Sequence, residues 1–502
     1  MHLFLRFCIR VRWKNFIPIL LSLKMKRLPT ILQRLIKIFF WGLLLQFFLQ
    51  TFVTYQLWWA DGLWNVVWLW KEIFILIFLG AIGFGYYHVV KHEWWKLTWA
   101  SIRSTEVFRF LIYFFVACFL TFLLAVGIQK IGLWTYILSF KYDLLGFLIF
   151  LLWVGLMWMF PLEHLKFHKR YQNILKFVIW GGLFRWGLIF LMPNALKFFG
   201  YSPVNFEGSL GTKPPAVYYT QINQGLVRNQ FLFERPLGLW FFLTAFWPLF
   251  ALSYLRLRSR KEQIWWTIGF GALVFSTLSR AALGVRLLQT AILALLIYRR
   301  QAKKLILYVW FPSFLILLVG LRQFRGIFMR EHSNTGHTVL FEEGIKIWMQ
   351  NPFFWWGAGY SGPASHQLCF RSEENARCDT IKEVNTKYEI KTYGYNPENQ
   401  YVQIFMEYWI VGLLPWLFCF GRLIWIGLKA TKPLILEIKK GKKADQKKLN
   451  QLALLVAFWL GMFGLALEGL VLHSFVDRMI VYPFMLLYGL SYGAVAKEHS
   501  DK

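Results

Sequence analysis

The sequence lacks several patterns that would each assign the protein to a familiar class. Apolar segments of about ten residues with alternating polarity, typical of transmembrane β-barrels, are absent. No Cys-x-x-Cys pair is present, which argues against a zinc site. No internal repeat is visible, whereas many secondary transporters carry one. No nucleic-acid-binding motif accompanies the net charge of +31, so that charge needs another explanation.

Apolar and aromatic residues dominate the composition. Of the 502 residues, 57% are hydrophobic and 20% are aromatic, with 27 Trp and 51 Phe. They form runs of mostly about 17–22 residues, long enough to cross a hydrocarbon layer of about 30 Å as helices. Lipid offers the backbone no hydrogen bonds, so these runs must be helical. We therefore predict an all-α, polytopic integral membrane protein.

The apolar runs predict about twelve transmembrane helices, with a large outer loop between the ninth and the tenth. The expected spans are residues 35–53, 73–90, 107–127, 144–160, 175–191, 237–255, 264–278, 281–298, 305–321, 401–428, 452–472 and 480–495. Lys and Arg concentrate in every second loop, and the positive-inside rule places those loops in the cytoplasm. This alternation accounts for most of the positive charge. It also places Arg280 and the polar segments 194–235 and 323–400 on the opposite, outer side.

The chain divides into four regions. A basic arm (1–34) precedes helices one to nine (35–322), the large outer loop (323–400) and helices ten to twelve (401–496). The apolar piece of the arm is too short for a signal-peptide core, so we expect the arm to lie in the cytoplasm, against anionic lipid. The large loop is polar yet rich in aromatics, which favours a functional loop over disorder.

Two of the five cysteines, Cys369 and Cys378, lie in the large outer loop. An oxidising compartment would allow them to pair. The alternative is two free thiols. The other three fall in the arm and in spans, where we expect them only to pack.

Three short motifs follow one another in the second half of the chain. Residues 279–281 (Ser-Arg-Ala) open a span after a short turn, and residues 351–352 (Asn-Pro) lead to residues 357–360 (Gly-Ala-Gly-Tyr). Residues 398–401 (Glu-Asn-Gln-Tyr) then lead through Glu407 to a Gly-Leu-Leu segment. This order resembles the O-antigen ligase and O-antigen polymerase superfamily. The resemblance extends roughly from residue 227 to the C-terminus.

The resemblance implies a GT-C-like inverting glycosyltransferase that uses no metal and no other cofactor. Such enzymes take a glycan from undecaprenyl pyrophosphate and attach it to lipid A core, to another glycan or to a protein. Three positions depart from the family pattern. Glu398 stands where the family usually has His, Ala281 where it has Gly, and His337 where it has Arg.

Arginines near the outer ends of spans are candidates for binding the pyrophosphate. A guanidinium group binds two phosphate oxygens at once and stays charged, so it can stabilise the leaving group. Arg280 matches the family motif, and Arg228 and Arg235 precede the sixth span. The alternative is that these charges only anchor span ends. Arg286 lies deeper, with Glu468 as a possible ion-pair partner.

The acceptor hydroxyl must lose a proton, and a carboxylate or an imidazole can act as the general base. Glu398, beside Asn399, occupies the family's His position and is our first candidate. His337 and His366 are the alternatives. Glu398 also opens a span, where a carboxylate favours the helix dipole, so a structural role is an equally weighted interpretation.

Aromatic residues of the large loop are candidates for contacts with sugar rings. Trp356 and Tyr360 stand beside Gly357 and Gly359, which allow the backbone to turn tightly. The alternative is an interfacial aromatic belt. Residues 141–143 (Lys-Tyr-Asp), at the outer end of the fourth span, are a further candidate for the same site.

The sequence thus favours a transferase for lipid-linked glycans in the bacterial cytoplasmic membrane, with its site facing the periplasm or exterior. The expected partners are a lipid-linked oligosaccharide donor, a glycan or lipid acceptor and membrane lipids, and no nucleic acid. A transporter or flippase for such lipids and a glycan-binding scaffold are the alternative hypotheses. Ligase and polymerase activity are not distinguished by the sequence.

Overall fold

The computed structural model describes residues 38, 41–42, 102–103, 105–128, 132–159, 164–192, 220–221, 226–233, 236–297, 331–350, 357–365, 396–441 and 445–500. Several predictions concern residues outside these ranges. They are most of the first expected span, the second and the ninth span, the candidates Arg235, Trp356 and His366, and the cysteines Cys369 and Cys378.

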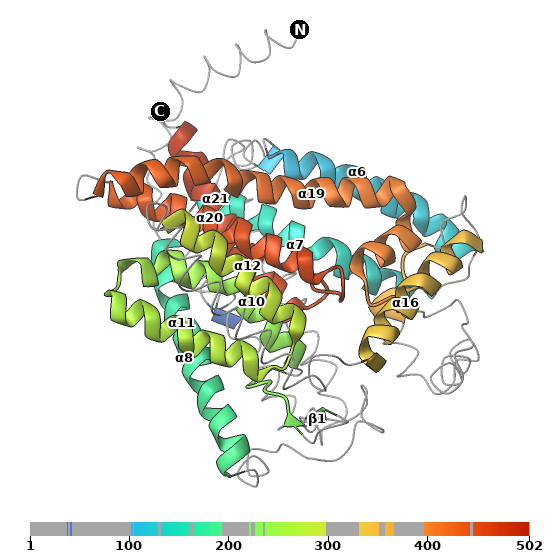
Figure 1. Cartoon of the computed structure of the whole chain (residues 1–502). Helices are drawn as coiled ribbons and strands as arrows, with labels where there is room; N and C mark the ends of the chain where they lie inside the picture. The colour runs from blue at the N-terminus through green and yellow to red at the C-terminus, as the bar shows by residue number, and fades with distance from the viewer. Residues whose placement is uncertain are drawn as a thin grey trace.

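The described residues are almost entirely helical, and Figure 1 shows their arrangement. The α-helices are α6 (Glu106–Phe122), α7 (Leu133–Met159), α8 (His164–Leu191), α10 (Pro236–Ser253), α11 (Arg260–Ser276), α12 (Arg280–Ile297), α16 (Glu331–Gln350), α19 (Gln400–Lys439), α20 (Gln446–Glu468) and α21 (Arg478–Ser500). A π-helix (Leu123–Ile128) extends α6, and a 3-10 turn (Leu255–Leu257) follows α10. The strands β1 (Thr220–Gln221) and β2 (Leu226–Val227) pair antiparallel.

Six of the described helices are long and apolar enough to cross a membrane. They are Glu106–Gly127, Leu133–Gly155, Pro236–Leu257, Gln400–Lys439, Gln446–Glu468 and Arg478–Ala496. The fold is therefore that of an all-helical, multi-pass membrane protein. The total of about twelve spans and the placement of the loops remain predictions.

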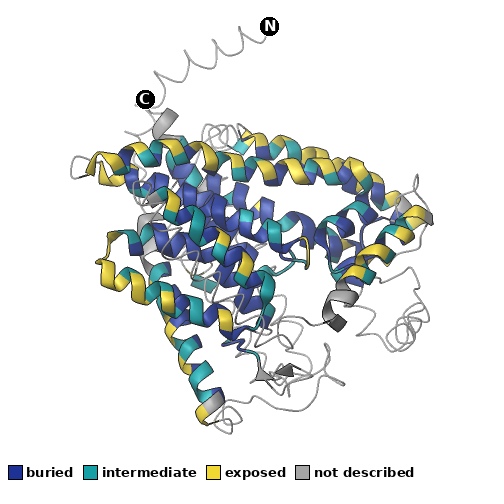
Figure 2. Cartoon of the chain, in the orientation of Figure 1, coloured by how far each residue is buried: buried dark blue, intermediate teal, exposed yellow. Residues whose placement is uncertain are grey.

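The helices form a buried centre and an exposed periphery, as Figure 2 shows. In Pro236–Leu257, which contains α10, 89% of the most apolar 18-residue stretch is buried. In α19 the corresponding share is 33%. On the periphery, Phe184 of α8 and Trp265 of α11 are 69% and 73% exposed. Large exposed apolar side chains on the helical periphery of a membrane protein are suited to contact lipid.

Pairwise contacts give the directions of the helices. α10 and α20 run antiparallel, because Trp240 lies against Glu468 and Ala245 against Gly461. α7 and α21 run parallel, because Gly146 packs on Val481 and Gly493 on Met157.

α6 and α19 are antiparallel. Phe114 packs on Tyr408 with ring centroids 5.1 Å apart, and Glu106 forms an ion pair with Arg422 at 2.9 Å. The sequence had placed residues 141–143 at the outer end of the fourth span. The helix begins eleven residues earlier than that span, so they lie within α7, where Asp143 is 3% exposed.

Candidate functional site

The start of α19 is tied to the turn that follows α20. The backbone N–H of Gln400 donates to the carbonyl of Gly469 (2.9 Å), and the side-chain amide of Asn399 donates to the carbonyl of Leu470 (2.7 Å). The N–H of Phe475 donates to the side-chain oxygen of Gln400 (3.0 Å). We call these three hydrogen bonds the α19 strap. They fix the position of the residues that precede α19.

Glu398 precedes the strap in an unusual backbone conformation. Its φ is +49°, in the left-handed region, which costs a residue with a side chain about 1–2 kcal/mol. The next residue, Asn399, is the N-cap of α19 and accepts hydrogen bonds from the N–H groups of Tyr401 and Val402, both at 3.0 Å. The Glu398 residue is partly exposed at the positive end of the helix dipole. Strain of this kind concentrates at functional sites, but the geometry also suits a helix-capping role.

Arg228 and Arg280 lie on two segments that meet. The guanidinium Nε of Arg228 donates to the carbonyl of Thr277 at 2.8 Å, three residues before Arg280 begins α12. Both arginines are partly buried. Burial lowers the pKa of Arg280 from its ordinary value, yet an arginine remains charged at neutral pH.

Asn229 holds the segment that carries Arg228. Its side chain is fully buried and donates to the carbonyl of Gly182 (2.8 Å) and to the hydroxyl of Ser276 (2.9 Å). Its side-chain oxygen accepts a hydrogen bond from Arg185 (2.9 Å). The backbone N–H of Asn229 also donates to the carbonyl of Ser276. These bonds join α8, the end of α11 and the segment before α10.

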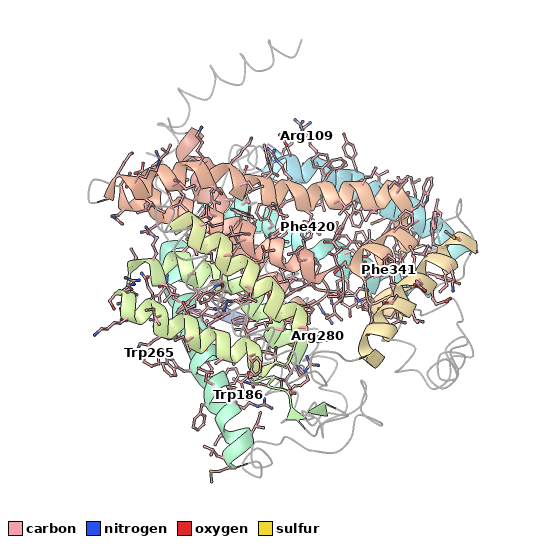
Figure 3. All side chains as sticks on the ribbon, viewed as in Figure 1. Arg109, Trp186, Trp265, Arg280, Phe341 and Phe420 are labelled. Carbon is pink, nitrogen blue, oxygen red and sulfur yellow. The ribbon has the colours of Figure 1, made fainter. Side chains whose placement is uncertain are left out.

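The start of α21 lies between these two groups of residues. The carboxylate of Asp477 lies 3.5 Å from the position that a Cβ on Gly238 would occupy, near the start of α10. The guanidinium carbon of Arg478 lies 5.0 Å from the ring centre of Tyr142 in α7. The starts of α10, α12, α19 and α21 therefore gather at one end of the bundle. Figure 3 labels Arg280 at this end.

Residues 357–365 form a compact turn beside α19. Gly357, Gly359 and Gly362 have φ values of +88°, +83° and +76°, which only glycine adopts without strain. The N–H of Gly359 donates to the carboxylate of Glu407 at 2.9 Å. Tyr360 is 6% exposed, so in this conformation its ring packs inside the protein. Contact with a sugar would require the turn to open.

Helix α16 carries His337 and packs on the same part of α19. Ile347 is buried, and the rings of Trp348 and Phe405 lie 4.8 Å apart. Two turns before Trp348, Phe341 is 44% exposed, and Figure 3 labels it. Two described parts of the segment 323–400, α16 and the turn 357–365, thus pack on the first turns of α19.

The ion pair considered for Arg286 is not formed. The guanidinium carbon of Arg286 lies 3.9 Å from the ring centre of Trp247 and 4.1 Å from that of Phe270. Glu468 instead accepts hydrogen bonds from Trp240 and Thr244. Aromatic faces stabilise the buried cation where a carboxylate was expected.

Comparison with known proteins identifies the segment that carries these residues. The family model of O-antigen ligase matches residues 265–417. We call this matched segment, residues 265–417, the O-antigen ligase domain. This match confirms the resemblance to the superfamily. None of the curated proteins and none of the solved structures matches the chain.

The O-antigen ligase domain extends from α11 into α19. It contains Arg280, His337, Glu398 and Asn399, whereas Arg228 and the start of α21 lie outside it. The family implies a glycosyltransferase-like enzyme that acts on lipid-linked glycans.

Three residues at this end of the bundle escaped the sequence interpretation. The structural role of Asn229 could not be predicted from the sequence, because a single Asn near a span is common in loops. Arg478 gave no signal either, because a single charge shortly before a span is common. Glu407 was visible in the family motif, but the sequence did not indicate which segments it joins.

Proposed function

We propose that this protein transfers a glycan from undecaprenyl pyrophosphate to an acceptor at the outer face of the bacterial cytoplasmic membrane. The acceptor hydroxyl attacks the anomeric carbon, and the bond from that carbon to the pyrophosphate oxygen breaks. The proton of the hydroxyl passes to a general base. The products are the glycosylated acceptor, with inverted anomeric configuration, and undecaprenyl pyrophosphate.

In this scheme Arg280 and Arg228 stabilise the negative charge of the leaving pyrophosphate. Fixed guanidinium groups supply that stabilisation without a metal ion. Two arginines on meeting segments give a concentrated positive charge, and repulsion between them falls when a diphosphate binds. Arg235 is a further candidate for this contact.

Glu398 is the proposed general base, with Asn399 beside it. A base must reach the acceptor hydroxyl, and partial exposure at the end of the bundle allows this. His337 and His366 are alternative bases, and Trp356 and Tyr360 are candidates for sugar contacts. Their roles rest on the family resemblance and on their position in the chain.

One observation carries the proposal. The O-antigen ligase domain contains both Arg280 and Glu398, and each stands at the start of a helix at the same end of the bundle. A positive group for the leaving diphosphate and a carboxylate for the attacking hydroxyl are thus supplied by one domain.

The test uses purified protein in lipid vesicles with a synthetic lipid-linked oligosaccharide donor. Arg280→Ala should lower the transfer rate about 100-fold or more, as loss of a transition-state charge contact does. The matched control is Arg260→Ala, which removes an exposed arginine at the start of α11, the helix end remote from Arg280. Unchanged transfer by Arg280→Ala would contradict the proposal. Movement of the donor across the vesicle without a new glycosidic bond would favour a flippase.

The acceptor is identified by mass spectrometry of surface glycans with and without the gene. A ligase leaves complete chains unattached to their anchor when it is lost. A polymerase leaves single units on the anchor. Either outcome fits the donor chemistry proposed here, whereas identical glycan profiles would argue against both.

A further inference from the structure

The first part of α19 is not continuous with the rest of the helix. Trp409 has φ 53° and ψ −163°, a combination that is essentially restricted to glycine. We call residues 400–408 the α19 head. Because the helix is broken at Trp409, the direction of the head is not set by the long segment that follows. Contacts with other elements must set it, and with it the position of Glu398.

The head is held at its start by the α19 strap and at its far end by two neighbouring side chains. The hydroxyl of Ser139 donates to Glu407 at 2.9 Å, and the hydroxyl of Tyr408 donates to Asp143 at 2.9 Å. Ser139 and Asp143 are four residues apart and so share one face of α7. The head is therefore fixed to α7 by two buried side-chain hydrogen bonds.

Glu407 also holds the glycine-rich turn. One carboxylate oxygen accepts from the N–H of Gly359 at 2.9 Å, and the other accepts from Ser139 and from Gln403 at 3.3 Å. The turn also approaches α7 closely. A Cβ on Gly359 would lie 3.0 Å from the backbone of Thr135. Glu407 thus joins three segments: α7, the turn and the head.

We propose that Glu407 is a positioning residue that orients the α19 head and thereby places Glu398 for its role in glycan transfer. The inference rests on the proposed function. Glu407 is fully buried, so it acts through the segments it joins rather than on a substrate. Its loss would leave the donors at Ser139, Gly359 and Gln403 unsatisfied, and these segments would shift.

Kinetics of two variants separate positioning from a charged role. A misplacement of about 1 Å can lower a rate about 100-fold, so Glu407→Ala should lower kcat about 10- to 100-fold. The donor KM should stay within about threefold, because the arginines are untouched. Glu407→Gln can accept from Gly359 and donate to Ser139, so its kcat should stay within about threefold of wild type.

The control is Glu437→Ala. Glu437 is a second buried Glu of α19 (3% exposed), bonded to Lys440 at the far end of the helix. Its removal should leave kcat unchanged. Wild-type kcat in Glu407→Ala would overturn the proposal, and so would a loss in Glu407→Gln as large as in Glu407→Ala. If Glu407→Ala does not accumulate in the membrane, Glu407→Asp replaces it in the test. The shorter side chain cannot reach both Ser139 and Gly359. Wild-type kcat in Glu407→Asp would also overturn the proposal.

Hydrogen exchange supplies a readout that does not depend on activity. The N–H of Gly359 should exchange faster in Glu407→Ala than in wild type or Glu407→Gln, with peptides of α20 unchanged. Equal exchange in all three would overturn the proposal. The wild-type protein could transfer no glycan while the variants show the expected exchange pattern. In that case the proposed function is wrong, but Glu407 still holds α7, the turn and the head together.

Discussion

Arg228 donates through its Nε to the carbonyl of Thr277, 2.8 Å away, and so connects the segment before α10 to the start of α12. The bond uses one N–H at the edge of the guanidinium and ties Arg228 to the turn that precedes Arg280. The segment that carries Arg228 is thus fixed three residues before Arg280 in the chain.

Replacement of Arg228 by Lys should weaken donor binding. Lys keeps the charge but is a point donor, so it cannot hold Thr277 and present a planar fork to a phosphate at once. We expect the donor KM to rise about tenfold or more, in line with the loss of a charged hydrogen bond. Initial rates against donor concentration provide the measurement. Arg260→Lys is the control, and an equal rise in both variants would show that the effect is not specific to this end of the bundle.

Replacement of Glu398 by Gly should separate stability from activity. Gly adopts a positive φ without strain, so the variant should unfold at a higher temperature, by an amount that corresponds to about 1 kcal/mol. Transfer should fall about 100-fold or more, because the proposed base is gone. Thermal unfolding in detergent and transfer assays measure the two effects.

Two further variants test the same residue. Glu398→Gln removes the charge at similar size and should lose activity with little change in stability. Glu398→His installs the side chain that the family usually has and should retain part of the activity. If Glu398→Gln transfers glycan at the wild-type rate, Glu398 is not the general base.

Replacement of Asn399 by Ala should lower both stability and activity. The variant loses the N-cap of α19, worth about 1 kcal/mol, and the bond to Leu470 in the α19 strap. Asp445→Ala is the matched control, because Asp445 is the N-cap of α20 and accepts from Lys447 and Lys448. It should lose similar stability and keep its activity.

Asn399→Asp refines this test. Aspartate preserves the cap but cannot donate to Leu470, so it isolates the strap. We expect activity between that of wild type and Asn399→Ala. Full activity in Asn399→Ala would mean that the position of the α19 start does not matter to transfer.

Replacement of Glu468 should affect stability through its two donors. Trp240 and Thr244 both donate to the same oxygen of Glu468 in the buried centre. Glu468→Gln keeps an acceptor for them, whereas Glu468→Leu leaves two buried donors unsatisfied, at about 1–3 kcal/mol each. We expect a large loss of thermal stability in detergent for Leu and a small one for Gln. Equal stability of Leu and wild type would contradict this bonding pattern.

The sequence predicted the helical class and the start of the tenth span well, because both follow from local signals. Apolar runs of spanning length allow only helices in lipid. Pro397 and Glu398 are typical of a helix start, and α19 begins at Gln400. The order of short motifs was enough to indicate the family that matches residues 265–417.

Other features depended on contacts that no local pattern encodes. Lys141 and Asp143 resembled the end of a span, but Asp143 is buried in α7 because Tyr408 donates to it. The partner of Arg286 could not be chosen from sequence, since aromatic rings and a carboxylate both stabilise a buried cation. The break in α19 at Trp409 could not be predicted from local sequence, because neither glycine nor proline occupies that position.

The break at Trp409 has a mechanical consequence. The α19 head belongs, by its contacts, with α16, the glycine turn and the end of α20 rather than with the rest of its own helix. α7 holds the head as well, through Ser139 and Asp143. A change in these contacts would therefore move the residues that precede α19 without tilting the long segment after Trp409.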